Sequence, residues 1–354
     1  MTTLTQEAKD LLKRLIQTPS LSKQEEGTAR LIADYIKSKN IPYERKGNNV
    51  WASNLFFDSS LPTILLNSHH DTVPPNSSYT LDPFIPTERE GKLYGLGSND
   101  AGASLVGLLA GFLYFYDKKL NYNLIYAATA EEEISGENGI GSILPGLGVL
   151  SFAIVGEPTE MQLAIAEKGL VVLHCRAKGR ASHAAHPNEN HAIYKAIEDI
   201  KKVEHYTFDR ISEVLGKVKA TVTVIQAGSL HNVVPDHCDF TIDVRTNEHY
   251  SNQEILDTFD ALLDSEVSPK SLRLNSSKIS LDHPIVLAAK RENCRLYGSP
   301  TISDQALIPF DSVKIGIGDS LRSHTADEFV YLRELEEGIS KYIRILSRVL
   351  LDNE

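Results

Sequence analysis

The chain has few cysteines, and they lie far apart. Cys175, Cys238 and Cys294 form no C-x-x-C pair, which excludes the usual spacing of a structural zinc site or a redox motif. Three widely separated cysteines also make no disulfide framework of the usual even-numbered kind. We therefore expect three reduced and buried thiols.

Long apolar runs and an excess of positive charge are missing as well. No segment has the ~18 consecutive apolar residues that a membrane-spanning helix needs, and residues 1–17 lack the apolar core and cleavage site of a signal peptide. The 36 basic and 47 acidic residues give a net charge of −11, which argues against nucleic acid or an anionic membrane as partner. We expect a cytoplasmic protein with a small-molecule substrate.

The length and apolar spacing predict two domains, the first of α/β class. A chain of 354 residues has room for two domains of ordinary size. Amphipathic helices are predicted over 4–17 and 23–39, with Ser22 as a candidate N-cap of the second. A buried helix is predicted over 103–116. Three short apolar runs are typical of buried strands: 61–67, 123–129 and 151–155. This pattern indicates a largely parallel or mixed sheet.

A different pattern, β-α-β-β-α-β, occupies residues 168–277. Its elements are expected at 169–177, 191–203, 219–227, 238–246, 253–263 and 272–279. Such a unit can bury one face of its sheet under its own two helices. We therefore predict a ferredoxin-like domain at 168–277, inserted into a domain made of 1–167 and 278–354. A helix at 284–297, a strand at 313–317 and a terminal helix from about 331 complete the second part of that outer domain.

The first candidate site is Ser68-His69-His70-Asp71, which follows the predicted strand 61–67. An H-x-D spacing also occurs at His237-Cys238-Asp239, and with twelve histidines about one chance match is expected. The two differ in context, because the first lies at the end of a buried strand. The second begins an alternating strand whose polar face would be solvated. The first is the stronger candidate.

Two more acidic sites adjoin predicted elements. The glycine-rich turn 94–100 ends at Asp100 and runs into the helix 103–116, so Asp100 could simply cap that helix. Glu131-Glu132-Glu133 follows the strand 123–129, and adjacent carboxylates repel each other unless they are solvated, protonated or bound to cations. A solvated charge run is the common case, but the direct junction with a buried strand favours a cation here.

Two single residues extend the set. Glu157 follows the strand 151–155 and precedes a proline, which by itself is typical of a simple turn. His324 lies in a polar loop, where a lone histidine is usually unremarkable. Together the candidates are imidazoles and carboxylates, the ligands that suit zinc, and none is a thiolate. They are His69, Asp100, Glu133, Glu157 and His324.

Eight motifs in a fixed order make the chain resemble the M20 family of metallopeptidases and deacylases. The motifs are SHHDTVP, LYGLGSNDA, TAEEEISG, VGEPT, GRASHAAHP, HNVVPD, DVR and GDSLRSHTADEF. Their joint occurrence covers nearly the whole chain and is highly specific, whereas any one alone would be weak. Within the family the chain is most similar to the acetylornithine (or acetylcitrulline) deacetylase and succinyl-diaminopimelate desuccinylase group.

The resemblance implies a site with two zinc ions per subunit, for which cobalt or manganese could substitute. Asp100 would bridge the ions, His69 and Glu157 would complete one ligand set, and Glu133 and His324 the other. Two such ions acidify a shared water and polarise the acyl carbonyl. Glu132 falls at the position of the general base. Asp71 resembles the carboxylate that orients the His69 imidazole.

The resemblance also assigns roles outside the metal ligands. The inserted domain would be a lid and the contact of a homodimer. His183 resembles a histidine that stabilises the oxyanion, and in relatives it and the asparagine at Asn232 reach the partner's active site. Arg245 resembles the arginine that clamps the substrate carboxylate, with a surface salt bridge on the strand as the alternative. Gly318 is a further expected substrate-binding position.

Two positions depart from the family pattern. Asp100 is followed by Ala101-Gly102-Ala103, where relatives commonly have a bulky residue and lysine, and Glu131 stands where aspartate is commoner. Neither departure removes a ligand, so they bear on substrate preference rather than on activity.

The function implied is a zinc-dependent amidohydrolase acting on a small N-acylated amino acid. We expect it to remove an acetyl or succinyl group from an amino acid such as ornithine or citrulline, in arginine biosynthesis. A lysine-pathway deacylase and a dipeptidase or carboxypeptidase of the same family are alternatives. A non-catalytic dimeric binding protein is a third, against which the intact Glu132 and the five filled ligand positions argue.

Overall fold

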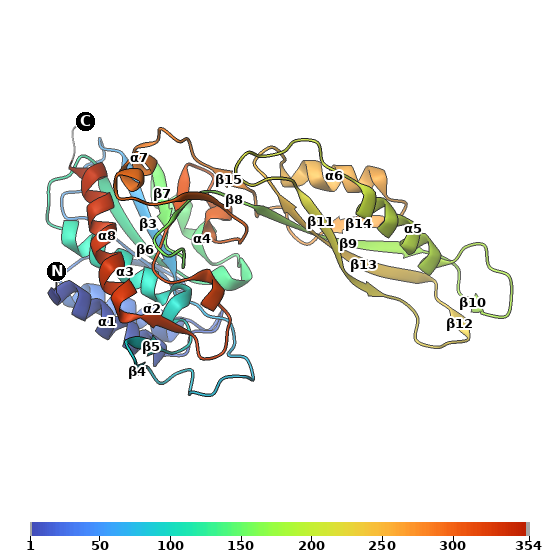
Figure 1. Cartoon of the computed structure of the whole chain (residues 1–354), viewed down its shortest axis with the longest axis horizontal. Coiled ribbons are helices and arrows are strands. Elements are labelled where there is room, and N and C mark those ends of the chain that lie inside the picture. Colours follow the sequence, from blue (N-terminus) through green and yellow to red (C-terminus); the bar gives the residue numbers. More distant parts are fainter. Residues whose placement is uncertain (1, 352–354) are drawn as a thin grey trace. The chain divides into compact units, whose positions relative to one another are not determined.

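The computed structural model describes residues 2–351 and divides into two compact units (Figure 1). Unit 1 falls within Met1–Ile165, Lys278–Tyr297 and Ser303–Glu354, and unit 2 comprises Ala166–Ser277 and Gly298–Ile302. The second unit thus includes the short segment 298–302, which the sequence placed with the outer domain.

Unit 1 is built on a mixed sheet that includes, in this order, the strands β1-β2-β6-β3-β7-β17-β8. Their bounds are β1 Glu44–Lys46, β2 Asn49–Ser53, β3 Thr63–His69, β6 Asn123–Thr129, β7 Phe152–Val155, β8 Leu163–Glu167 and β17 Ser312–Lys314. Strand β3 runs parallel to both β6 and β7, and every residue of the three strands is buried. Continuous apolar runs of this kind are typical of strands covered on both faces. The predicted α/β class is confirmed.

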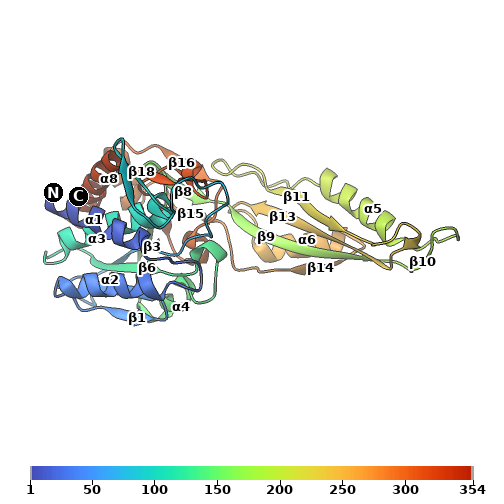
Figure 2. The same cartoon turned by 90° about the horizontal axis from the view of Figure 1, so that it is seen from below.

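Helices cover the sheet of unit 1 on both faces (Figure 2). Helix α3 (Ala103–Phe115) is almost entirely buried and packs against β3 and β6, with α1 (Thr2–Ile16) and α8 (Leu332–Leu350) beside it. On the opposite face, α4 (Ile140–Ile143) packs its isoleucines against Leu65 and Ile125. The remaining helices are α2 Glu26–Ser38 and α7 Pro284–Arg291.

A small antiparallel sheet of unit 1 has the order β18-β5-β4. Its strands are β4 Thr87–Arg89, β5 Lys92–Tyr94 and β18 Phe329–Tyr331. Strand β5 leads into the turn that carries Asp100, and β18 follows the segment that carries His324. Pairing β18 with β5 therefore brings two predicted ligand segments, far apart in sequence, to the same place.

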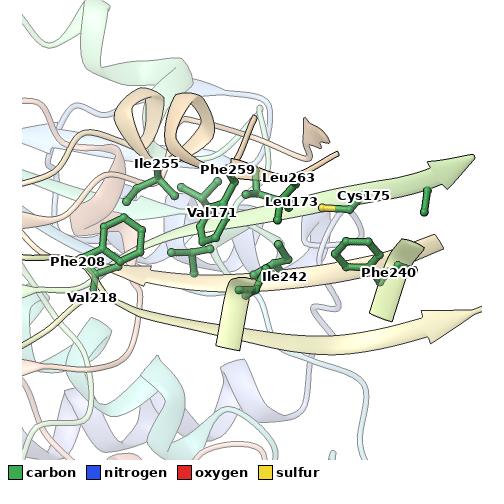
Figure 3. Close-up of a cluster of buried hydrophobic side chains, with 14 of the residues drawn as sticks. Val171, Leu173, Cys175, Phe208, Val218, Phe240, Ile242, Ile255, Phe259 and Leu263 are labelled. Atoms are coloured by element: carbon green, nitrogen blue, oxygen red, sulfur yellow. The ribbon is translucent and has the colours of Figure 1, made fainter. Parts of the chain in front are cut away.

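Unit 2 has the predicted β-α-β-β-α-β order, with an antiparallel sheet arranged β11-β13-β9-β14. The elements are β9 Gly169–Lys178, α5 Ala192–His205, β11 Lys219–Gln226, β13 His237–Thr246, α6 Asn252–Leu262 and β14 Glu266–Pro269. Burial alternates along β9 and β13, so one face carries the apolar side chains. These pack under the helices, with Leu173, Ile242 and Phe259 at the centre (Figure 3). A separate two-stranded antiparallel sheet, β10 Ser182–His183 with β12 Val233–Val234, belongs to the same unit.

Two predicted boundaries are wrong for local reasons. Helix α7 ends at Arg291 instead of 297, because Asn293 adopts a left-handed φ of 57° and the Cys294 N–H turns back to the Ala289 carbonyl. The residues after it form β16 (Leu296–Ser299).

The last strand of unit 2 also lies elsewhere than predicted. It is β14, whereas the expected strand 272–279 contains only the short β15 (Ser277–Lys278). The Asn252 amide donates hydrogen bonds to the Leu272 and Leu274 carbonyls, and the Leu274 carbonyl also accepts the Leu170 N–H of β9 at 2.9 Å. The apolar alternation of these two leucines is therefore not accompanied by a regular strand ladder.

Cys175, Cys238 and Cys294 are free and buried, as expected. Within residues 2–351, no helix has both the length and the apolar character needed to cross a membrane.

Candidate metal centre

Three of the predicted ligand segments leave the same edge of the sheet of unit 1. In the parallel register, His69 of β3 pairs with Thr129 of β6, and Asn67 pairs with Val155 of β7. The residues that follow these strands must therefore meet, as functional groups do at the carboxyl edge of parallel sheets. They include Glu132, Glu133 and Glu157.

Asp100 lies between the two predicted histidine ligands. Its Oδ1 is 3.3 Å from His69 Nε2, and its Oδ2 is 3.7 Å from His324 Nε2. The imidazole of His324 is also 3.0 Å from Glu133 Oε2. On the other side, His69 Nε2 is 3.6 Å from Glu157 Oε1 and 3.8 Å from Glu132 Oε2. One carboxylate thus presents one oxygen to each imidazole.

Two groups in this cluster have the spacing of a metal site. The ligand atoms of His69, Glu132 and Glu157 lie within 4.8 Å of one another, and so do those of His69, Asp100 and Glu133. These groups share His69 and include Glu132, which the sequence placed as a base and not as a ligand. All five predicted metal ligands and Glu132 are therefore brought together.

The electrostatics of the cluster are those of a site with too many acids. Burial, together with neighbouring carboxylates, raises the pKa values of Glu132 and Glu157 well above the usual range. Burial alone would lower the pKa of His69, but Glu132, Glu157, Asp100 and Asp71 outweigh it and raise that pKa. Buried Glu157 Oε1 has no hydrogen-bond partner among the described residues. An unpartnered carboxylate beside imidazoles fits a divalent cation such as zinc.

Asp71 supports both histidine and acid segments. The His69 Nδ1 atom lies 3.0 Å from the Asp71 carbonyl oxygen and 3.4 Å from its Oδ1. The Asp71 carboxylate accepts the N–H groups of Glu132 and Glu133 at 3.0 and 3.2 Å. It also accepts the Ser22 hydroxyl at 2.7 Å. Ser22 is therefore not the predicted N-cap of α2, which follows Glu25.

The simpler explanations offered for the acidic segments do not describe this structure. Helix α3 has no side-chain cap, and Asp100 faces the histidines instead. Glu131 is buried and accepts the Asn138 N–H and side-chain amide at 3.2 and 2.9 Å. A Cβ atom at Gly136 would come within 2.0 Å of Glu131 Oε2, so only glycine fits there. The charge run is thus not solvated.

Two further buried acids escaped the sequence interpretation. Glu328 is 2% exposed and accepts three backbone N–H groups from the turn of Asp100, while burial raises its pKa to about 8. Asp304 accepts the Asn67 amide and the Thr129 hydroxyl at 2.9 and 2.7 Å, and burial raises its pKa to about 6. The only signal in the sequence was for Glu328, which lies inside the motif GDSLRSHTADEF, whereas Asp304 lies in none of the eight motifs. Burial of loop acids leaves no periodic pattern.

The structure also places the predicted substrate-binding residues. Gly318 has φ +102° and packs so closely that a Cβ would lie 2.4 Å from Asn99 Oδ1. His183 of β10 and Asn232, just before β12, lie side by side at the two-stranded sheet of unit 2, where the Ala184 N–H donates to the Asn232 carbonyl.

The other two unit 2 features concern β13. Arg245 binds Asp243 of its own strand at 2.8 and 3.0 Å, which is the salt-bridge arrangement considered as the alternative. His237, from the second H-x-D spacing, is half exposed and pairs with Asp236.

Comparison with known proteins supplies the wider context. The model of a family described as peptidase family M20/M25/M40 matches residues 65–348. A succinyl-diaminopimelate desuccinylase of Xylella fastidiosa (strain 9a5c) is 26% identical over 97% of this chain and 99% of its own length. One from Wolbachia pipientis wMel is 25% identical over 76% of this chain and 72% of its own.

Solved structures share the fold. A tripeptidase of Staphylococcus aureus has a TM-score of 0.76 at 19% identity and covers 98% of both chains. A Bacillus subtilis protein described as a dinuclear metal-binding peptidase of family M20 has a TM-score of 0.74 at 18% identity, over 99% of both chains.

Proposed function

The chain belongs to peptidase family M20/M25/M40, and from that premise we propose that it is a two-metal amidohydrolase that deacylates a small N-acylated amino acid. The observation that carries the proposal is the position of Asp100, with one oxygen toward His69 and the other toward His324. A single carboxylate facing two imidazoles is the geometry that a bridging ligand requires. The raised pKa values of Glu132 and Glu157 support it as well, because they show that these carboxylates lack sufficient nearby positive charge, which bound metal ions would provide.

The residues divide naturally into two ligand sets that share Asp100. His69 and Glu157 would complete one, and Glu133 and His324 the other. Zinc is the proposed metal, and cobalt or manganese would accept the same donors. Two such ions would acidify the attacking water, polarise the acyl carbonyl and stabilise the developing oxyanion.

Glu132 is the proposed general base. Its carboxylate reaches the cluster, 3.8 Å from His69 Nε2, yet it is not needed to complete either ligand set. It would take a proton from the attacking water and return it to the leaving nitrogen, which must be protonated to depart as an amine. Asp71, which holds the Glu132 and Glu133 N–H groups, keeps this base in register with the ligands.

Four other residues are proposed to handle the substrate. His183 would stabilise the oxyanion and Asn232 would assist it, as residues of unit 2 that act across a homodimer. Arg245 would clamp the substrate carboxylate with its planar guanidinium, in place of the Asp243 pair. Gly318 would line the substrate site, where the close approach of Asn99 already requires glycine.

Two biosynthetic pathways offer candidate substrates, which differ in the acyl group and in the amino acid. Acetyl or succinyl derivatives of ornithine or citrulline, as in arginine biosynthesis, are the first candidates. The relatives named desuccinylases support the lysine-pathway alternative, in which the substrate is succinyl-diaminopimelate. Structural similarity to a tripeptidase keeps peptide cleavage as a further test case.

A hydrolysis panel tests this proposal. The zinc-loaded protein would be assayed with N-acetyl and N-succinyl ornithine, citrulline, lysine and diaminopimelate, beside several dipeptides. We expect one acyl-amino acid to dominate, and Glu132→Ala to lower kcat by at least about 100-fold because the proton carrier is lost. Turnover of dipeptides alone would replace the deacylase proposal with a peptidase. No turnover of any compound would favour a binding protein.

A further inference from the structure

The turn that carries Asp100 is held by a carboxylate from a distant part of the chain. Glu328 Oε1 accepts the N–H groups of Asn99 and Asp100 at 2.8 and 2.9 Å, and Oε2 accepts the Gly97 N–H at 3.0 Å. The Glu328 side chain is 2% exposed. Both carboxylate oxygens are thus engaged with the main chain of a single turn.

The turn needs this acceptor because its own carbonyls satisfy only part of it. Within the turn, the Ser98 N–H finds the Gly95 carbonyl and the Gly102 N–H finds the Gly97 carbonyl, at 3.1 and 3.0 Å. The N–H groups of Gly97, Asn99 and Asp100 instead donate to the Glu328 carboxylate. Buried N–H groups are almost always paired, since an unpaired one loses its hydrogen bonds to water and gains none in the protein.

An ordinary helix start would not use such a distant residue. Helices are usually capped by a side chain at the position just before them, yet α3 has no side-chain cap. Glu328 instead accepts the N–H groups that precede α3, and it lies beside a second carboxylate, that of Asp100. Placing two acids together is unfavourable for stability alone, so the arrangement points to the position of Asp100 as its purpose.

The same short segment also supplies a ligand directly. His324 lies four residues before Glu328, and the Glu328 carbonyl accepts the Gly95 N–H at 3.0 Å. Segment 324–328 therefore carries the His324 imidazole directly. It also positions the Asp100 carboxylate, because Glu328 binds the main chain of the turn 97–100. A shift of the Glu328 carboxylate would therefore move Asp100 relative to His324.

We infer that Glu328 is a positioning residue that fixes the bridging carboxylate of Asp100 relative to His324, an inference that rests on the proposed two-metal function. Glu328 contacts neither substrate nor metal in this scheme. It acts on the main chain from which Asp100 projects, and so it should influence both metal positions at once.

Metal binding to the metal-free protein tests the inference without relying on activity. Zinc titration by calorimetry would be compared for wild type and Glu328→Gln, with the absorption spectrum of the cobalt form as a report of ligand geometry. The glutamine keeps the size but turns a donor toward one of the three N–H groups. We expect both zinc equivalents to bind about 10- to 100-fold more weakly, an altered cobalt spectrum, and a lower kcat with little change in KM.

Asp327→Asn is the matched control. Asp327 also accepts three hydrogen bonds from a loop, those of the Thr80 N–H and hydroxyl and the Leu81 N–H, but away from Asp100. Its substitution should leave zinc affinity within about twofold of wild type. If Glu328→Gln does not fold, Glu328→Asp, which keeps the charge but is shorter, replaces it with the same expected loss.

The outcomes separate the inference from the proposed function. Wild type that binds two zinc ions beside a weakened Glu328 variant supports both. A folded variant with wild-type zinc affinity and cobalt spectrum overturns the inference alone, even if its melting temperature falls. Wild type that binds no zinc overturns the proposed function and the inference together.

Discussion

Each unit buries acidic side chains, but the two units surround them differently. In unit 2, Asp199 of α5 is 1% exposed and accepts the Ser265 hydroxyl and N–H, the Asp264 N–H and the Lys202 ammonium at 2.6 to 3.1 Å. These donors outweigh burial and lower its pKa. In unit 1, Glu132 and Glu157 are buried among other acids, and their pKa values are raised well above the usual range.

The difference separates Asp199, a structural acid, from the acids of the proposed metal site. A buried carboxylate saturated with donors ties elements together, as Asp199 ties α5 to the loop before β14. Carboxylates gathered without enough donors destabilise the fold unless protons or cations bind them. In unit 1 such carboxylates gather at the edge of the parallel strands, which supports the proposed site there.

The largest effect should come from removing one acid of the unit 1 cluster. Glu157→Gln takes away a proposed ligand whose Oε1 has no hydrogen-bond partner in the described chain. We expect hydrolysis to fall by at least about 100-fold, while the melting temperature of the metal-free protein stays equal or rises. A large loss of metal-free stability would mean that Glu157 is structural like Asp199, and the comparison would fail.

The converse experiment in unit 2 should alter stability and spare the metal site. Asp199→Ala leaves buried N–H groups of the 264–265 loop unpaired, so denaturant unfolding should show a loss of about 3 kcal/mol. Zinc affinity, measured well below the melting temperature, should stay within about twofold of wild type. The control is Asp264→Ala, which removes only an exposed partner of Lys202 and should cost less than about 1 kcal/mol. Equal losses in the two variants would contradict the role given to Asp199.

A smaller effect concerns pH and metal removal. The pKa of Glu328 is raised to about 8, and those of Glu132 and Glu157 are also raised. An acid with a raised folded pKa binds its proton more tightly in the folded state, so its contribution to stability is lost as pH rises through that pKa. The metal-free protein should thus be more stable at pH 5.5 than at pH 8, by about 2 kcal/mol.

Zinc should oppose that trend. Ligands must be deprotonated to bind a metal, so zinc affinity rises with pH. The stabilisation of the zinc-loaded over the metal-free protein should therefore be larger at pH 8 than at pH 5.5. Asp199, whose lowered pKa adds stability above an unfolded value of about 3.9 and loses it only below that pH, should contribute equally at pH 5.5 and 8. Denaturant unfolding at both pH values, with zinc or with chelator, measures this. A chelated protein that is more stable at pH 8 would contradict the assignment.

Prediction from the sequence succeeded where periodicity and burial coincide. Apolar patterns compatible with one type of element predicted helix α3, strand β6 and the order of elements in unit 2. Prediction failed where a side chain takes part in hydrogen bonds that the sequence pattern does not indicate. Leu272 and Leu274 alternate like a strand, but the Asn252 amide binds both carbonyls and the backbone adds one hydrogen bond, from the Leu170 N–H to the Leu274 carbonyl. Ser22 looks like a helix cap and instead binds Asp71.

The sequence by itself determined the chemical types at the site and their place after buried strands, because residue type and local periodicity are written in the chain. Only the tertiary structure decided that Asp100 stands between two imidazoles and that Glu328 and Asp304 are buried beside them. Asp100 and Glu328 meet across 228 positions of the chain. Periodicity tells which side of an element is apolar, but the partner that lies against a polar group depends on how distant segments pack.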